Sequence, residues 1–192
     1  MNFAARWHYQ LAQMFLFFKL DERAVRELTE ALKIDPRHVL ATESLGFLHA
    51  AKGRRHAAIE HFTKALEIAP GRAETWFNLG FVYHQNNAYD EALDAFRRAI
   101  ALSPNLDRAW YGMGLVQRSL GQLEDAVAAL RKAGKLQPMN PHAWYELGKT
   151  YYALKRYDKV QEVIEYLHEF DPKVTMQLMR ETPDRGGPAP PA

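Results

Sequence analysis

A proline recurs in this chain every 34 residues, at the end of five similar stretches such as ALKIDPRH (31–38) and ALEIAPGR (65–72). The prolines are Pro36, Pro70, Pro104, Pro138 and Pro172, with no insertion or deletion between them. A fixed period of this length is typical of repeat proteins, in which each repeat is one supersecondary unit. The period therefore constrains the fold more than any other feature of the sequence.

Other residue types recur in step with the proline. With the proline at the thirty-second position, the chain contains five units: 5–38, 39–72, 73–106, 107–140 and 141–174. The eighth position is small in every unit, and the twentieth is alanine or valine. The fourth position is tryptophan in the last three units (Trp76, Trp110, Trp144), and the twenty-fourth is large and apolar (Leu28, Phe62, Phe96, Leu130, Ile164).

This spacing predicts two short helices per unit. At about 100° per residue, positions four, seven, eight and eleven share one face of a first helix and are buried together. Small residues at positions eight and twenty allow the two helices to approach closely. We expect Gly53 and Gly121 in the turn between helices, since glycine readily adopts left-handed backbone angles. A helix pair this short cannot bury its own apolar face, so neighbouring pairs are expected to stack.

The pattern resembles the tetratricopeptide repeat, and the resemblance covers residues 5–174. The most similar units are AETWFNLGFVYHQNNAYDEALDAFRRAIALSP and DRAWYGMGLVQRSLGQLEDAVAALRKAGKLQP, while the terminal units depart most. The resemblance implies an all-α, right-handed α-solenoid that binds proteins and is not an enzyme. Pentatricopeptide RNA-binding proteins share the helix-pair logic, but the Trp, Leu-Gly, Ala and Pro positions fit them less well.

The segments outside the five units have their own predictions. A short lead-in comes before residue 5, and residues 175–182 are expected to form a capping helix that covers the last repeat. Residues 183–192 are rich in proline and glycine, which predicts a disordered tail.

Composition excludes several function classes. The formal charge of +2 does not suggest the basic stripe of a nucleic-acid-binding protein, although an RNA-binding repeat protein stays a third alternative. Cysteine is absent, so cysteine-ligated metals and thiol nucleophiles are excluded. The apolar run at 14–18 is shorter than the ~20 residues of a spanning helix, which favours a cytoplasmic protein. His56 and His61 are too far apart around a helix to form a metal pair, and we expect no metal, cofactor or catalytic site.

First helices line the concave groove of tetratricopeptide arrays, and positions two, five, six, nine, twelve and thirteen point there. Position nine carries Phe47, Phe81 and Leu115, whereas the family usually has a polar residue. This apolar stripe favours a binding site for a partner segment, with basic and tyrosine side chains in later units suited to acidic residues. The Lys and Asn clamp of chaperone-tail binders is not reproduced. The predicted groove residues are Tyr9, Phe47, Phe77, Phe81, Arg108, Tyr111, Leu115, Tyr145 and Lys149.

The N-terminal end of the array offers a second candidate surface. The third, tenth and fourteenth positions face a preceding unit, and the later units keep the third position small. The first unit has no preceding unit, yet it carries large side chains there. The predicted end-face residues are Phe3, Trp7, Met14 and Phe18. The alternative function is therefore a structural or assembly subunit that self-associates or docks through this end face.

Overall fold

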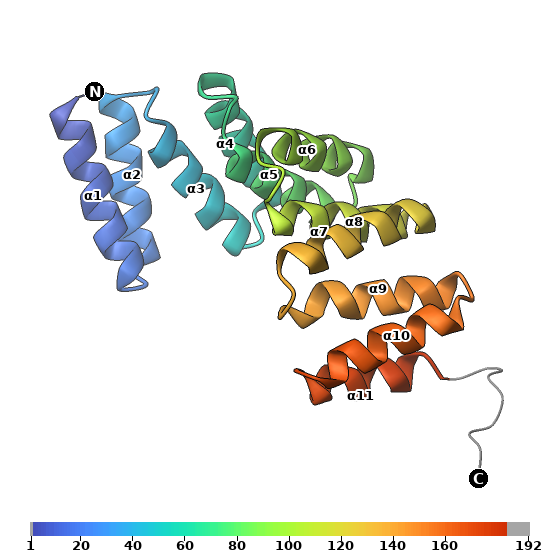
Figure 1. The fold of residues 1–192 in the computed structure, drawn as a ribbon. Coiled ribbons are helices and arrows are strands. Elements are labelled where there is room, and N and C mark those ends of the chain that lie inside the picture. Colours follow the sequence, from blue (N-terminus) through green and yellow to red (C-terminus); the bar gives the residue numbers. More distant parts are fainter. Residues whose placement is uncertain (1, 184–192) are drawn as a thin grey trace, which may run out of the picture. The chain divides into compact units, whose positions relative to one another are not determined.

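The computed structural model describes residues 2–183, which fold into eleven α-helices and contain no β-strand (Figure 1). Most of the predicted tail at 183–192 lies outside the described residues. The helices are α1 (Phe3–Phe17), α2 (Asp21–Ile34), α3 (Val39–Ala51), α4 (Arg55–Ile68), α5 (Ala73–Gln85), α6 (Tyr89–Leu102), α7 (Asp107–Ser119), α8 (Leu123–Leu136), α9 (Pro141–Ala153), α10 (Tyr157–His168) and α11 (Pro172–Glu181).

The chain divides into two compact units, Met1–Ser103 with α1 to α6 and Pro104–Ala192 with α7 to α11. In the first unit, α1 packs on α2, α3 on α4 and α5 on α6; in the second, α7 packs on α8 and α9 on α10. Helices α3, α5, α7 and α9 each begin at the first residue of a predicted repeat. The prediction of an all-α solenoid of helix-turn-helix repeats is confirmed.

The turns between the two helices of each pair share one backbone feature, a residue with a left-handed φ. Five residues have a left-handed φ between 56° and 75°, and each lies between the two helices of a pair: Lys19, Gly53, Asn87, Gly121 and Lys155. In the turn after α3, the N–H of Arg54 donates to the carbonyl of His49 at 2.9 Å, a bond that closes the end of the helix. The two predicted turn glycines therefore occupy left-handed positions, and lysine or asparagine occupies them elsewhere.

Close approach within each pair depends on the small eighth position. A Cβ atom placed on Gly80 would lie 2.9 Å from the buried Phe96 ring, and one on Gly46 would lie 2.8 Å from the ring of Phe62. Real Cβ atoms essentially never come this close. The aromatic ring at position twenty-four therefore fills the space that a side chain at position eight would take.

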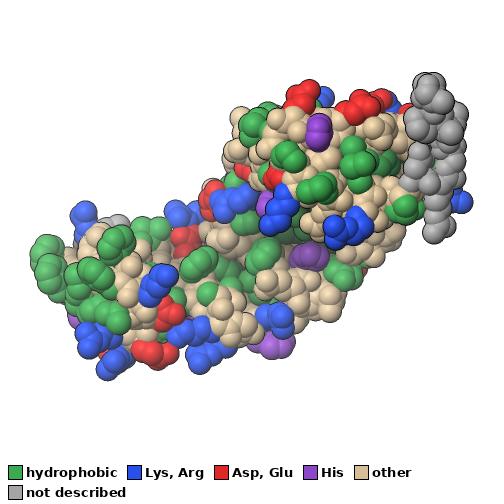
Figure 2. Space-filling view, turned by 90° about the horizontal axis from the view of Figure 1, so that it is seen from below, with side chains coloured by type: hydrophobic (Ala, Val, Ile, Leu, Met, Phe, Trp, Pro, Cys, Tyr) green, Lys and Arg blue, Asp and Glu red, His purple; other side chains and the backbone are tan. Residues whose placement is uncertain are grey.

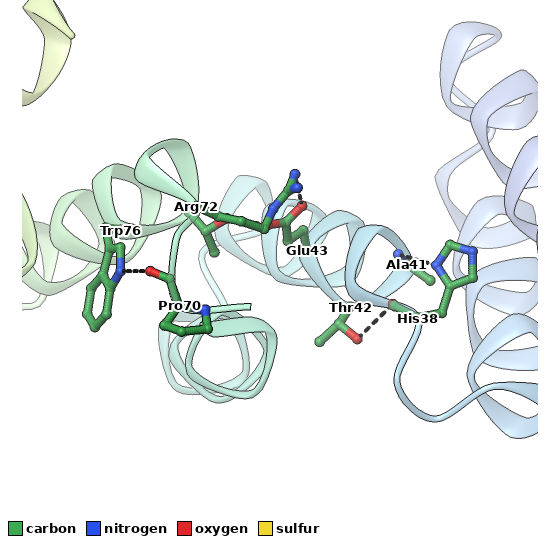
Figure 3. A network of polar contacts seen from close by, with 8 residues as sticks. His38, Ala41, Thr42, Glu43, Pro70, Arg72 and Trp76 are labelled. Carbon is green, nitrogen blue, oxygen red and sulfur yellow. Dashed lines mark hydrogen bonds and ion pairs between the residues drawn. The ribbon is translucent and has the colours of Figure 1, made fainter. Parts of the chain in front are cut away.

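Each tryptophan at position four ties its helix to the loop before it. The indole N–H of Trp76 donates to the carbonyl of Pro70 at 2.9 Å (Figure 3), and Trp144 makes the same bond to Pro138 at 3.0 Å. Trp110 repeats it with Pro104 at 2.8 Å. These bonds join the end of one repeat to the start of the next.

Helix α11 closes the second unit. It begins at Pro172, three residues before the predicted capping segment, and the Asp171 side chain accepts from the N–H of Val174 at 3.0 Å. Leu178 is fully buried against α9 and α10, in a cluster with Leu147, Val163 and Leu167. None of the helices of residues 2–183 has the length and apolar character to span a membrane.

Candidate functional site

The face formed by the first helices of the first unit, α1, α3 and α5, is called the inner face of that unit. Phe47 on α3 is 61% exposed, and Phe81 on α5 is 45% exposed. Phe77 is half-buried, and its ring stacks on Phe81 with centroids 6.4 Å apart. Helices α3 and α5, which carry these side chains, contact each other.

An ion pair fixes the position of α3 against the start of α5. The Glu43 carboxylate accepts a hydrogen bond at 2.8 Å from Nη2 of Arg72, the residue that precedes α5 (Figure 3). It also accepts from Nε of Arg72 and from the Thr75 hydroxyl. Glu43 lies one helical turn before Phe47, so the network anchors the backbone that presents Phe47. Neither Glu43 nor Arg72 was among the predicted site residues.

The predicted residue Tyr9 packs on the loop between α2 and α3. Its ring lies 5.1 Å from that of His38, and its pKa is raised, mainly by burial. His38 is itself buried and is the N-cap residue that precedes α3. Its Nδ1 accepts from the N–H of Ala41 at 3.2 Å, and its carbonyl accepts from the Thr42 hydroxyl (Figure 3). Tyr9 therefore supports the start of α3.

In the second unit, the inner face formed by α7 and α9 carries ion pairs. Arg118 Nη1 lies 2.6 Å from a carboxylate oxygen of Glu146. Tyr111 is half-buried, and its pKa is raised by burial and by the nearby Glu146. Leu115 is also half-buried, while Arg108 is exposed.

Helix α11 contacts the two remaining predicted groove residues. Nζ of Lys149 lies 5.0 Å from the Tyr145 ring centroid and 3.2 Å from a carboxylate oxygen of Glu181. The amide of Gln177 donates to the Tyr145 hydroxyl at 2.9 Å. Hydrogen bonds from Tyr145, Gln177 and Lys149 lower the pKa of Glu181 to about 2. Lys149 is therefore already paired with a carboxylate of α11.

Helix α1 carries an exposed apolar stripe, called the end face. The four predicted residues are all exposed, from 45% for Met14 to 82% for Phe3, and Phe17 is also exposed. At about 100° per residue, all five lie within one side of the helix. Figure 2 shows the hydrophobic side chains gathered over α1 at the left edge of the view.

Histidines form a stacked pair rather than a metal site. The rings of His49 and His61 lie 5.2 Å apart and nearly parallel, and burial lowers the pKa of both. Within residues 2–183, no three His, Asp or Glu side chains come together in an arrangement that could hold a metal ion.

Comparison with known proteins places these features in a family. Residues 7–170 match the family described as the Cilia and flagella-associated protein 70 C-terminal domain. No curated protein matches the chain. Three similar solved structures are the tetratricopeptide protein YrrB, described as having an unusual peptide-binding site (22% identity, 90% of this chain and 90% of that chain, TM-score 0.78), MamA from Desulfovibrio magneticus RS-1 (24%, 96% and 99%, 0.78), and the type IV pilus biogenesis factor PilW (24%, 94% and 86%, 0.79).

These three likenesses concern the fold. The 34-residue repeat, the paired helices and the family match extend over nearly the same residues. The chain belongs to the tetratricopeptide-repeat family of the Cilia and flagella-associated protein 70 C-terminal domain.

Proposed function

We propose that this chain is a protein-interaction scaffold that binds an apolar segment of a partner protein on the inner face of its first unit. The observation that carries the proposal is the exposure of Phe47 and Phe81 on two helices that contact each other. Tetratricopeptide arrays are interaction modules, and the similar protein YrrB has a peptide-binding site, which supports the same kind of role here.

The two phenylalanines offer enough surface to anchor a segment. A buried aromatic side chain covers about 150–250 Å², so the exposed parts of these two amount to roughly 200 Å². At about 25 cal/mol per Å², covering them would contribute about 5 kcal/mol before the cost of association. The stacked ring of Phe77 and the Glu43 network hold their surroundings in place, so little ordering accompanies binding.

The test is affinity capture from the native host with Phe47→Ala and Phe81→Ala, singly and together. We expect the double variant to lose the partners of the wild type, while its melting temperature changes little because both side chains are exposed. Met139→Ala is the matched control, since Met139 is an exposed apolar residue in the loop between α8 and α9. Unaltered capture by the folded double variant would refute the proposal.

The end face supports a second candidate function, self-association. Its five side chains together expose on the order of 600 Å² of apolar surface. A symmetric pair of end faces would bury about twice that area, which lies at the lower end of stable interfaces. Sedimentation of Trp7→Glu beside wild type tests this candidate, with Phe47→Ala as control. A wild-type mass equal to one chain, or a mass that Trp7→Glu leaves unchanged, removes the oligomer.

A further inference from the structure

Two clefts on the second helices of the repeats occupy the same place in the repeat register. In the first unit, a cleft of about 390 Å³ lies between α4 and α6, with α5 beneath it. In the second unit, a cleft of about 510 Å³ lies between α8 and α10, with α9 beneath it. Trp144, Leu147 and Tyr151 of the second cleft follow their counterparts Trp76, Leu79 and Tyr83 by two repeats.

The two clefts have opposite net charges, and two of their matching positions carry charges of opposite sign. Where the first cleft has Thr63, Glu67 and Glu91, the second has Arg131, Lys135 and Lys159. The first cleft, which also contains Asp94 and Arg98, has three carboxylates against one cation, a formal charge of −2. The second, with Glu162, has three cations against one carboxylate, a formal charge of +2.

The cations of the second cleft are only partly neutralised. Nζ of Lys159 lies 2.5 Å from a carboxylate oxygen of Glu162, and Arg131 donates to the Tyr151 hydroxyl. Lys135, one turn after Arg131 on α8, has no ion pair with any residue of the described range 2–183. Arg131 and Lys135 are exposed at the rim, so an acidic ligand can reach both of them.

Aromatic and apolar surface lies between these cations. Leu147, Tyr151 and Val163 are buried at the base of the cleft. The indole of Trp144 is held by its bond to Pro138, and its ring lies 4.6 Å from that of Tyr166.

A glycine changes the wall of this cleft. Where the first unit has Leu66, the second has Gly134, and a Cβ atom there would lie 2.7 Å from the Trp144 ring. Trp144 therefore packs directly on the backbone of α8, in the space that the leucine side chain takes in the first cleft.

We propose that the cleft between α8 and α10 binds an acidic peptide segment, in which Asp or Glu residues flank an apolar or aromatic side chain. The acidic side chains would pair with Lys135 and Arg131 on one wall and Lys159 on the other, while the apolar side chain packs beside Trp144. This site is separate from the inner-face contact proposed above.

The shape and charge of the cleft favour this occupant over two others. A phosphate group prefers donors that converge on one point, whereas these cations stand along two helices and enclose an apolar base. The acidic cleft of a second copy is hollow as well, so two such surfaces do not fill each other. An extended chain with alternating acidic and apolar side chains can enter the cleft and match both features.

The experiment is selection from a random dodecapeptide library displayed on phage, with the immobilised full chain as target. The most enriched peptide is then made with a fluorescein label and titrated by anisotropy. The test variant is Arg131→Thr, Lys135→Glu and Lys159→Glu, which carries the residues of the acidic cleft. We expect acidic peptides with an apolar residue on wild type, and at least about tenfold weaker binding by the variant.

The matched control is Arg180→Thr, Lys132→Glu and Lys173→Glu, which changes the net charge equally with exposed residues that do not line the cleft. We expect it to bind within about threefold of wild type, because exposed charges that do not line the cleft are screened by solvent and salt. If the triple test variant does not fold by circular dichroism, Lys135→Glu alone is used, with about threefold weaker binding expected.

Four results of the peptide experiment would overturn the proposal, and a fifth concerns the oligomeric state. The four are no enriched acidic peptide, equal binding by the test variant, equal loss by the control variant, and displacement of the peptide by sodium tripolyphosphate at the concentration at which unlabelled peptide displaces it. The last result would indicate a phosphate site. A wild-type dimer that the test variant dissociates would instead identify a second copy as the occupant.

Discussion

Replacing Leu178 with alanine should destabilise the second unit more than any change to the exposed surface of α11. Leu178 is fully buried, and a Cβ atom on Gly148 would lie 2.7 Å from its Cδ2. Removing its outer carbons loses about 2.4 kcal/mol of transfer free energy at about 0.8 kcal/mol per carbon. A residual cavity of about 50 Å³ adds about 1.2 kcal/mol, at about 24 cal/mol per Å³. The expected loss in the free energy of unfolding is therefore about 3–4 kcal/mol.

Equilibrium urea unfolding followed by circular dichroism measures this loss, and Met179→Ala is the control. Met179 is the next residue of α11, is 53% exposed, and should cost less than about 0.5 kcal/mol. Hydrogen exchange gives a second readout, since the amides of residues 173–182 should exchange faster if α11 depends on Leu178 for docking. A Leu178→Ala variant within about 1 kcal/mol of Met179→Ala, with unchanged exchange in α11, would refute the assignment of Leu178 as its anchor.

Three further predictions concern stability and ionisation. Burial lowers the pKa of His49 and His61 in the folded state. Their contribution to folding stability is therefore present above the unfolded pKa of about 6.5 and is lost as the pH falls below it. The melting temperature should fall from pH 7 to 5, and it should fall less steeply in His61→Phe. Equal slopes would contradict this. Gly80→Val should cost about 1–3 kcal/mol, because its Cβ meets the Phe96 ring, whereas Gly71→Ala, with open space around it, should be neutral in the same melts. Carbon-detected NMR should give Glu181 a pKa near 2. The contacts of Glu181 with α9 should be present above about pH 4.5 and be lost as the pH falls towards 2. A measured pKa near 4.5 would show that these contacts do not form in solution.

The repeat pattern predicted the fold well because its constraints are local. Positions eight and twenty-four recur in every unit, and Gly80 and Phe96 show that they meet as their residue types require. The turn positions could be predicted equally well, because glycine occupies them in two units. Lys19 and Lys155 adopt the same left-handed φ at the matching positions of other units. Physical rules that act over one helix pair are therefore visible in a single sequence.

The side-chain partners of the predicted site residues could not be predicted from rules that act within one helix pair. The repeat register places Lys149 at a predicted groove position. Its pairing with Glu181, however, depends on how α11 packs, and α11 begins three residues earlier in the chain than expected. The pairing of Glu43 with Arg72 likewise joins residues 29 positions apart through their rotamers. Sequence register assigns a face to a residue, whereas long side chains choose their partners in three dimensions.

The charge reversal between the two clefts becomes visible in the sequence only when the outer positions of the repeats are compared. Comparing core positions across repeats reveals the fold, because those positions stay alike. Glu67 and Lys135 share an outer position at which the repeats differ. Comparing outer positions two repeats apart is the signal that would have revealed the cleft.

The bonds between tryptophan and proline give the protein built-in optical probes. Trp76, Trp110 and Trp144 each sit at a different junction between repeats, held by the same backbone acceptor, while Trp7 lies exposed on α1. Because solenoid stability is a sum of repeats and their interfaces, the junctions need not open together. Variants that retain a single junction tryptophan would report by fluorescence the order in which the repeats separate.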